Sequence, residues 1–346
     1  MGWCTTLDLD RFLTVAGGYL TARAAENTLL LSAAQAAQTA QPTHSARPSQ
    51  PPQPSQAPQP PQPPQAAQAK PAAAQATREV KGGGSLFGWW EPPDGSGPRG
   101  AFMHDPSIPV LIGGRTPELA ASLAVTLSKA GRPVCGVDAP LEAADAFAAA
   151  WSQRAGLAVR VHRQSMVYRL TGAVPEHPMP FGGPDGRLRP ATRADRELLV
   201  TWLKAFKTEV GEFTTAPETT ADDLLAYGGA AFWEASGYPV AMATITRPVA
   251  RTVRMSVVYT PPEHRRNGYA AAVMHAVSRA VLAAPARNGT GQITEVVMIT
   301  DGNRPDRQAM RLGYEFVGER AVLRFGPATG SIPRVPTGPL PRLRSR

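Results

Sequence analysis

The segment from residue 254 to residue 284, RMSVVYTPPEHRRNGYAAAVMHAVSRAVLAA, most constrains the fold. A strand-like run ends at VVYT, a polar loop follows, and a glycine opens a long helix. The start of a helix exposes free backbone N–H groups and the positive end of the helix dipole, and such a site binds phosphate. Arg265 and Arg266 add charge-assisted donors, and Gly268 has no side chain where a ligand would approach. The segment therefore predicts a strand–loop–helix unit that binds a pyrophosphate.

This segment resembles the GNAT superfamily of acyl-CoA-dependent N-acetyltransferases. The hallmark of that family is Arg/Gln-x-x-Gly-x-Gly/Ala, and Arg265-Arg266-Asn267-Gly268-Tyr269-Ala270 fits it. VVMITDGN, a short helix and LGYEFVG follow, as in the second motif of the family. The resemblance covers residues 187–326 and implies a GNAT N-acetyltransferase domain with acetyl-CoA as co-substrate and no metal.

The resemblance also implies which residues hold CoA. Backbone groups of Val258, Tyr259 and Thr260 would meet the pantetheine arm and the acyl carbonyl. The loop from Arg265 to Ala270 would wrap the pyrophosphate, and Asn303 would contact the pantetheine. CoA would lie in a splayed gap between two neighbouring strands. The implied set is Val258, Tyr259, Thr260, Arg265, Arg266, Asn267, Gly268, Tyr269, Ala270 and Asn303.

Catalytic groups are harder to place from the sequence. Direct attack needs a base for the amine, and family members often use a Tyr acid for the leaving thiolate. The position of that Tyr is Ala309 here, so Tyr259 or Tyr269 would have to substitute. Glu234 and Glu263 are the candidate bases. A base acting through water, or catalysis mostly by positioning, is also consistent with the sequence.

The two halves of the chain repeat one order of elements: helix, hairpin, strand, helix, strand, helix, strand. Residues 314–325, YEFVGERAVLRF, read as a terminal strand pair. We interpret the repetition as an internal duplication. The first copy carries Gly113-Gly114-Arg115-Thr116-Pro117 at the corresponding loop and lacks the Arg-x-x-Gly-x-Ala spacing, so we expect no CoA there.

The fold class expected is α/β (α+β), with two GNAT-like lobes, each a mixed, mostly antiparallel twisted sheet flanked by helices. Residues 38–84 are rich in Pro, Gln and Ala, which predicts a disordered linker, either a spacer or a ligand for a Pro-binding partner. The expected domains are the helical start of the N-terminal lobe (1–37), that linker, the remainder of the lobe (85–171), a second linker (172–186), the GNAT domain (187–326) and a disordered tail (327–346).

Composition excludes several classes of protein. Apolar runs are far shorter than the roughly 18 residues of a membrane span. Cys4 and Cys135 are the only cysteines, so a disulfide framework is excluded and a reducing, cytoplasmic location is expected. The net charge of +9 would suit a protein that binds nucleic acid. However, much of the excess lies in the Arg-rich tail, so nucleic acid is disfavoured as a partner.

The sequence thus predicts an N-acetyltransferase that moves acetyl from acetyl-CoA to a primary amine of a small molecule or peptide, as a monomer or homodimer. A non-catalytic acyl-CoA-binding or scaffold protein is the alternative, and a nucleic-acid binder acting through residues 327–346 is a third reading.

Overall fold

The computed structural model describes residues 2–40, 84–172, 174, 183–211, 216–286, 291–302 and 304–327. The first half contains β1 (Gly2–Thr6), α1 (Leu9–Thr21), α2 (Thr28–Ala40), β2 (Leu86–Glu91), β3 (Gly100–His104), β4 (Val110–Gly113), α3 (Pro117–Lys129), β5 (Gly136–Pro140), α4 (Leu141–Ala155) and β6 (Ala158–Thr171). The second half contains β7 (Arg187–Pro190), the 3₁₀ turn η2 (Arg193–Asp195), α5 (Arg196–Val210), α6 (Pro217–Tyr227), β8 (Ala230–Ala235), β9 (Tyr238–Ile245), β10 (Thr252–Tyr259), the 3₁₀ turn η3 (Pro262–His264), α7 (Tyr269–Ala283), β11 (Glu295–Asp301), α8 (Arg307–Arg311) and β12 (Glu315–Gly326).

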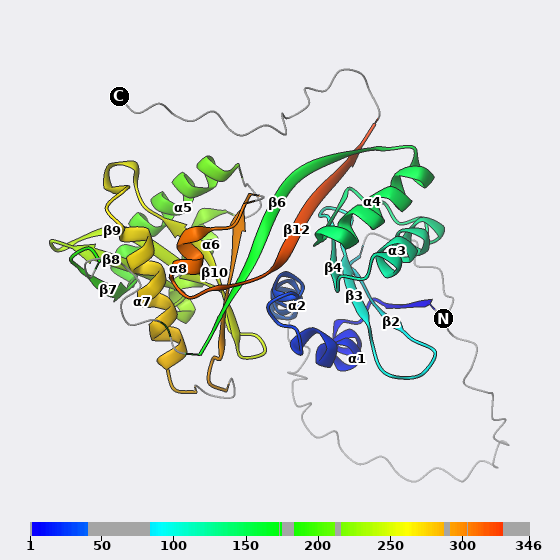
Figure 1. Cartoon of the computed structure of the whole chain (residues 1–346), viewed down its shortest axis with the longest axis horizontal. Helices are drawn as coiled ribbons and strands as arrows, with labels where there is room; N and C mark the ends of the chain where they lie inside the picture. Colours follow the sequence, from blue (N-terminus) through cyan, green and yellow to red (C-terminus); the bar gives the residue numbers. More distant parts are fainter. Residues whose placement is uncertain are drawn as a thin grey trace, which may run out of the picture.

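The described strands form one sheet with the order β1-β2-β3-β4-β5-β12-β6-β11-β10-β9-β8-β7. Only the pairs β4–β5 and β10–β11 are parallel among the described strands, and the other neighbours are antiparallel. Helices flank the sheet in two groups (Figure 1). The expected fold class is therefore confirmed. The order is also symmetric about the β12–β6 pair, in agreement with an internal duplication.

The two halves exchange their last strands at the centre of the sheet. β6, from the first half, pairs with β11 of the second half, and β12 pairs with β5 of the first half. β6 and β12 also pair with each other along their lengths, and Figure 1 shows them side by side between the two helix groups. Each lobe is therefore completed by a strand from the other half of the chain.

Residues 314–325 were expected to form a strand pair, which is wrong. Residues from Glu315 to Gly326 form one continuous strand, β12, which pairs along its length with β6. The register with β6 shifts between Phe316 and Gly318 and again between Val322 and Leu323. These irregularities are bulges within one strand, and no turn divides it.

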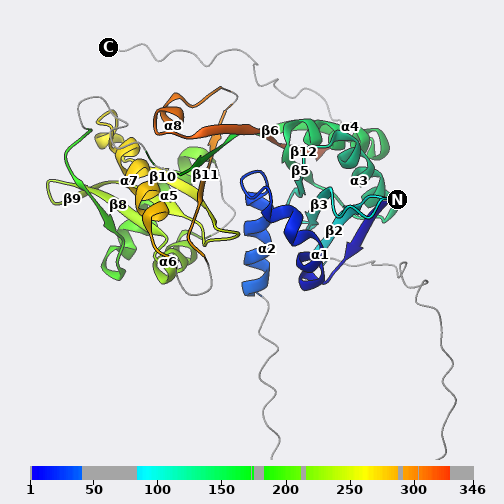
Figure 2. The same cartoon turned by 60° about the horizontal axis from the view of Figure 1, so that its bottom comes forward.

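Helices cover both faces of the second half of the sheet. Val273 and Met274 of α7 share a buried cluster with Met255 of β10 on one face. On the other face, α5 and α6 pack against Phe232 and Tyr259. In the view of Figure 2, α2 lies between the two helix groups, and its Gln35 Nε2 donates a hydrogen bond to the carbonyl of Pro248 over 3.1 Å. The expected linkers and tail lie largely outside the described residues.

Candidate functional site

Strands β10 and β11 run parallel and then separate. Their pairing ends at Met255 and Met298. Beyond that pair, β10 continues beside β9 to Tyr259, and β11 continues beside β6 to Asp301. A bulge between Met255 and Val257 helps to turn β10 away, because it breaks the regular register with β9. The splayed gap expected from the sequence is therefore present.

A cavity of about 590 Å³ opens at this gap, within the range of small-molecule sites. Its wall comes from both strands beyond the separation, from the first turns of α7, from α8 and the end of α5, and from α2, β5, β6 and β12. The lining residues are Leu29, Asp138, Arg163, Ser165, Phe206, Val210, Arg254, Met255, Ser256, Val258, Ala270, Met274, Met298, Ile299, Thr300, Asp301, Asp306, Gln308, Arg320, Ala321 and Val322. The cavity therefore joins the gap to the region where the exchanged strands meet.

The loop before α7 presents backbone donors beside this cavity. Arg266 and Gly268 both have left-handed backbone conformations, with φ of 68° and 81°. The first hydrogen bond of the helix runs from the Ala272 N–H to the Gly268 carbonyl. The backbone N–H groups from Arg266 to Ala271 have no acceptor within the described part of the chain. Such a group of free donors at a helix start suits an anion.

Arg265 is held by its neighbours. Its Nη2 donates to both carboxylate oxygens of Glu209, on α5, over 2.6 and 2.8 Å. Its Nε donates to the Thr260 carbonyl over 2.9 Å. Arg266 is exposed on the same loop. Arg265 thus fixes the loop against α5 through these contacts.

The residues at the end of β10 lie in different surroundings. Val258 lines the cavity, as does Ala270 at the start of α7. Tyr259 is only 6% exposed and packs against Trp202 with ring centroids 5.9 Å apart. Burial raises the pKa of Tyr259. The Thr260 hydroxyl is buried and has no partner among the described residues. This placement favours a packing role for Tyr259 and leaves Thr260 with an unsatisfied polar atom.

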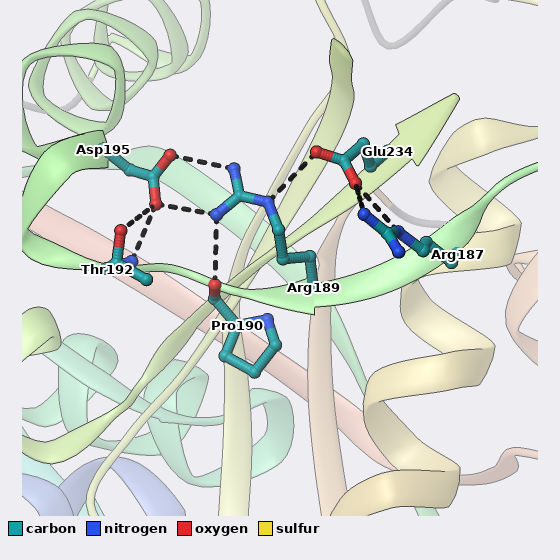
Figure 3. A network of polar contacts seen from close by, with 6 residues as sticks. All are labelled: Arg187, Arg189, Pro190, Thr192, Asp195 and Glu234. Atoms are coloured by element: carbon teal, nitrogen blue, oxygen red, sulfur yellow. Dashed lines mark hydrogen bonds and ion pairs between the residues drawn. The ribbon is translucent and has the colours of Figure 1, made fainter. Parts of the chain in front are cut away.

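Glu234 lies on β8, next to the edge strand β7, and is not among the residues that line the cavity. Its carboxylate accepts from Arg187 over 2.9 Å and from Arg189 over 3.2 Å, and Arg189 also binds Asp195 (Figure 3). The hydrogen bond from Arg187 lowers the pKa of Glu234. These contacts make Glu234 a weak base, because its proton affinity falls when two guanidinium groups stabilise the carboxylate.

The other sequence-derived candidates are dispersed. Glu263 is exposed in η3, outside the cavity wall, and Asn267 is exposed in the loop. Tyr269 packs against the α7 cluster. Ala309, in the place of the usual Tyr, is completely buried. Asn303 lies outside the described residues.

Several charged residues of the cavity wall did not stand out in the sequence. Arg254, on β10, and Asp301, at the end of β11, line the wall beside Asp138 and Arg320. Arg320 is 6% exposed and donates to the Asp138 carboxylate over 2.7 Å. A signal for Arg254 existed, since a charge inside an otherwise apolar strand calls for a partner.

The corresponding loop of the first half is filled by side chains. A Cβ at Gly113 would lie 2.7 Å from the Asn27 Oδ1, and one at Gly114 would lie close to the Tyr19 hydroxyl. Arg115, next along, faces Glu26 and β12. Side chains from α1 and from the loop before α2 therefore pack against this loop. The corresponding loop of the second half, before α7, has free backbone N–H groups instead.

No group of three or more His, Cys, Asp or Glu side chains in the described ranges is arranged to hold a metal ion. No described helix combines the length and the apolar character that crossing a membrane requires.

No family model and no curated protein matches the sequence. Solved structures are similar. A GCN5-related N-acetyltransferase from Sphaerobacter thermophilus is 15% identical, over 73% of this chain and 82% of that one, with a TM-score of 0.47. A GCN5-related N-acetyltransferase from Kribbella flavida is 20% identical, over 67% and 88%, with a TM-score of 0.42. A tandem GNAT protein from the clavulanic acid biosynthesis pathway is 14% identical, over 72% and 84%, with a TM-score of 0.40.

Each of these three structures is named as a GNAT or GCN5-related protein. At identities of 20% or lower and TM-scores below 0.5, they do not assign a reaction.

Proposed function

We propose that this protein is an acyl-CoA-dependent N-acyltransferase that transfers acetyl from acetyl-CoA to a primary amine. The observation that carries the proposal is the separation of β10 and β11 after Met255 and Met298, at a cavity that also reaches the first turns of α7. The free N–H groups after Arg266 and the unpartnered Thr260 hydroxyl suit the pyrophosphate and the pantetheine arm.

The chain would act mainly by positioning. Backbone donors from Arg266 to Ala271 bind the pyrophosphate, and β10 beyond Met255 offers an edge with a strand partner on one side only. Acetyl-CoA supplies a thioester. The amine nitrogen attacks its carbonyl carbon, the C–N bond forms, the C–S bond breaks, and the amine proton passes to a base or to water. Roles for Glu234, Glu263 and Tyr259 in proton transfer stay predictions.

A non-catalytic acyl-CoA-binding protein is the second candidate. One observation favours it: the described residues that line the cavity include no Tyr, His or Cys. A leaving thiolate would then have to take its proton from water. Cytoplasmic location and a monomeric or dimeric state stay predictions under either function.

Two measurements test the proposal. Calorimetry with acetyl-CoA should give saturable binding to the full chain, and the absence of binding would contradict both candidates. Thiol release, followed with and without each member of a panel of primary amines, should exceed hydrolysis for at least one amine. Binding without any amine-dependent release would leave the scaffold reading in place of the enzyme.

A further inference from the structure

The inner end of the cavity holds an arginine whose charge is not paired. Arg254 projects from β10 and lines the wall. Its Nε is buried and has no hydrogen-bond partner among the described residues. In the described ranges its guanidinium forms no ion pair. A buried polar group of this kind calls for a partner, because leaving it unsatisfied costs free energy.

The neighbouring charges also leave Arg254 without a carboxylate of its own. Asp138 faces Arg254 electrostatically, but its carboxylate is taken by Arg320 over 2.7 Å. Burial lowers the pKa of Arg254, the Arg320 charge acts in the same direction, and Asp138 opposes them. Two guanidinium groups therefore share one carboxylate, so this end of the cavity has one positive charge in excess.

The position of Arg254 separates this charge from the phosphate loop. Val253 and Met255 pack in the cluster of α7, so Arg254, between them, projects to the opposite face of the sheet. Leu29, Asp138 and Arg320, from the first half and from the exchanged strand β12, meet it there. Pyrophosphate donors lie at the start of α7, on the other side of the gap. An anion at Arg254 would thus belong to a second ligand.

We propose that Arg254 binds a carboxylate of the acceptor, so that the acceptor is an amine that also carries a carboxylate. This inference rests on the proposed function, since it names the substrate class of the same site. A planar guanidinium matches a carboxylate with two parallel hydrogen bonds. Asp301 lies in the same wall at the end of β11. One of its carboxylate oxygens contacts the Arg163 Nε over 3.6 Å and the Ser165 hydroxyl over 3.4 Å, and the other oxygen of this half-exposed side chain is the one that would meet the ammonium end of such a molecule.

The mixture of charges favours an amino acid over a more strongly anionic ligand. The cavity wall carries Arg163, Arg254 and Arg320 together with Asp138, Asp301 and Asp306. The last of these already caps α8 by accepting from the Gln308 and Ala309 N–H groups. A phosphate would place a second negative charge among three carboxylates, whereas a zwitterion matches both signs.

The test uses the full chain and matched acceptor pairs: each amino acid beside its carboxamide, with β-alanine and γ-aminobutyrate beside their amides. At least one acid should exceed its amide in kcat/KM by about tenfold or more, because a site built for a polar group rejects the analogue that lacks it. Arg254→Gln should reduce that ratio to about threefold or less, and Arg254→Lys should keep part of it. Arg247→Gln, an exposed arginine paired with Asp223 outside this cavity, is the matched control.

Binding separates this inference from the proposed function. The same pairs are titrated at millimolar concentration into the CoA-loaded protein, whether or not transfer occurs. Acid binding that Arg254→Gln abolishes, with unchanged acetyl-CoA affinity and thermal midpoint, supports the inference even if no thiol is released. The inference would be overturned if the wild-type protein showed equal kcat/KM and equal binding for acids and amides, or if it bound no acid. Both outcomes are measured on the wild-type protein, so they do not depend on whether a variant folds.

Discussion

Arg265 donates two hydrogen bonds to the carboxylate of Glu209, over 2.6 and 2.8 Å, and so ties the loop before α7 to the end of α5. Both side chains are a little over two-fifths exposed, so the pair itself is worth about 1 kcal/mol or less. Its effect is on placement, since it orients a loop whose backbone donors face the proposed ligand.

Glu209→Gln is therefore expected to weaken acetyl-CoA binding by about fivefold or less, which is the range of an exposed ion pair. Arg265→Ala should weaken it further, because it also removes the hydrogen bond to the Thr260 carbonyl. Calorimetric Kd values check this. Glu218→Gln, which breaks the exposed pair with Lys204 between α5 and α6, is the control and should leave the Kd unchanged.

Arg266 combines a charge with an unfavourable backbone conformation, with φ of 68°. Arg266→Gly removes the charge and relieves the strain, so stability should rise by about 1 kcal/mol while acetyl-CoA affinity falls by about 3- to 10-fold. Arg266→Lys should retain most of the affinity. Thermal melts and calorimetry measure the two effects, and a variant whose affinity and stability change in the same direction would contradict this account.

Gly268 precedes α7 with φ of 81° and stands where free N–H groups gather. Gly268→Ala should destabilise the fold by about 1–2 kcal/mol, because a Cβ is disfavoured in the left-handed region. It should also weaken acetyl-CoA binding. Gly17→Ala is the matched control: no atom lies within 4 Å of a Cβ there, so the helix should gain about 0.5–1 kcal/mol. Similar melts for the two variants would refute the prediction.

The pairs around Arg189 should make the second half sensitive to acid. Hydrogen bonds from Arg187 and Arg189 lower the pKa values of Glu234 and Asp195, respectively. Such carboxylates stabilise the fold above their ordinary pKa values, and this contribution is lost as the pH falls toward the lowered values. Asp195→Asn should therefore lower the thermal midpoint at pH 7, and the difference from the wild type should shrink below about pH 4. A difference that stays constant across this range would exclude the ion pairs as the cause.

Local signals in the sequence predicted much of the second half. The pattern from residue 254 to residue 284 gave β10, the loop and α7, because strand alternation, a glycine and helical spacing are all local features. The gap between β10 and β11 followed from the resemblance to known GNAT motifs.

The strand exchange and the inner end of the cavity could not be predicted. The partners of β6 and β12 lie far along the chain, as Ser165 and Asp301 illustrate, and alternation fixes a face but not a neighbour. Arg254 stands between apolar residues in Val-Arg-Met, which indicates that it needs a partner, but the local pattern does not say which residues surround it. Asp138 of β5 and Arg320 of β12, which line the cavity with it, come from parts of the chain far from β10 in sequence.

The exchange of β6 and β12 predicts that the two halves cannot separate without unfolding. β6 pairs with β11 from Ser165 to Thr171 and with β12 from Ala158 to Arg169, so a cut between residues 174 and 183 leaves every one of these pairs intact. A protease site inserted there should be cleavable, with the fragments still eluting together and melting as one unit near the midpoint of the uncut chain. The same site inserted between residues 41 and 83 is the control for cleavage at a site outside the exchange. Two fragments that separate under native conditions and each keep a cooperative melt would show that the lobes fold independently, which the shared sheet does not allow.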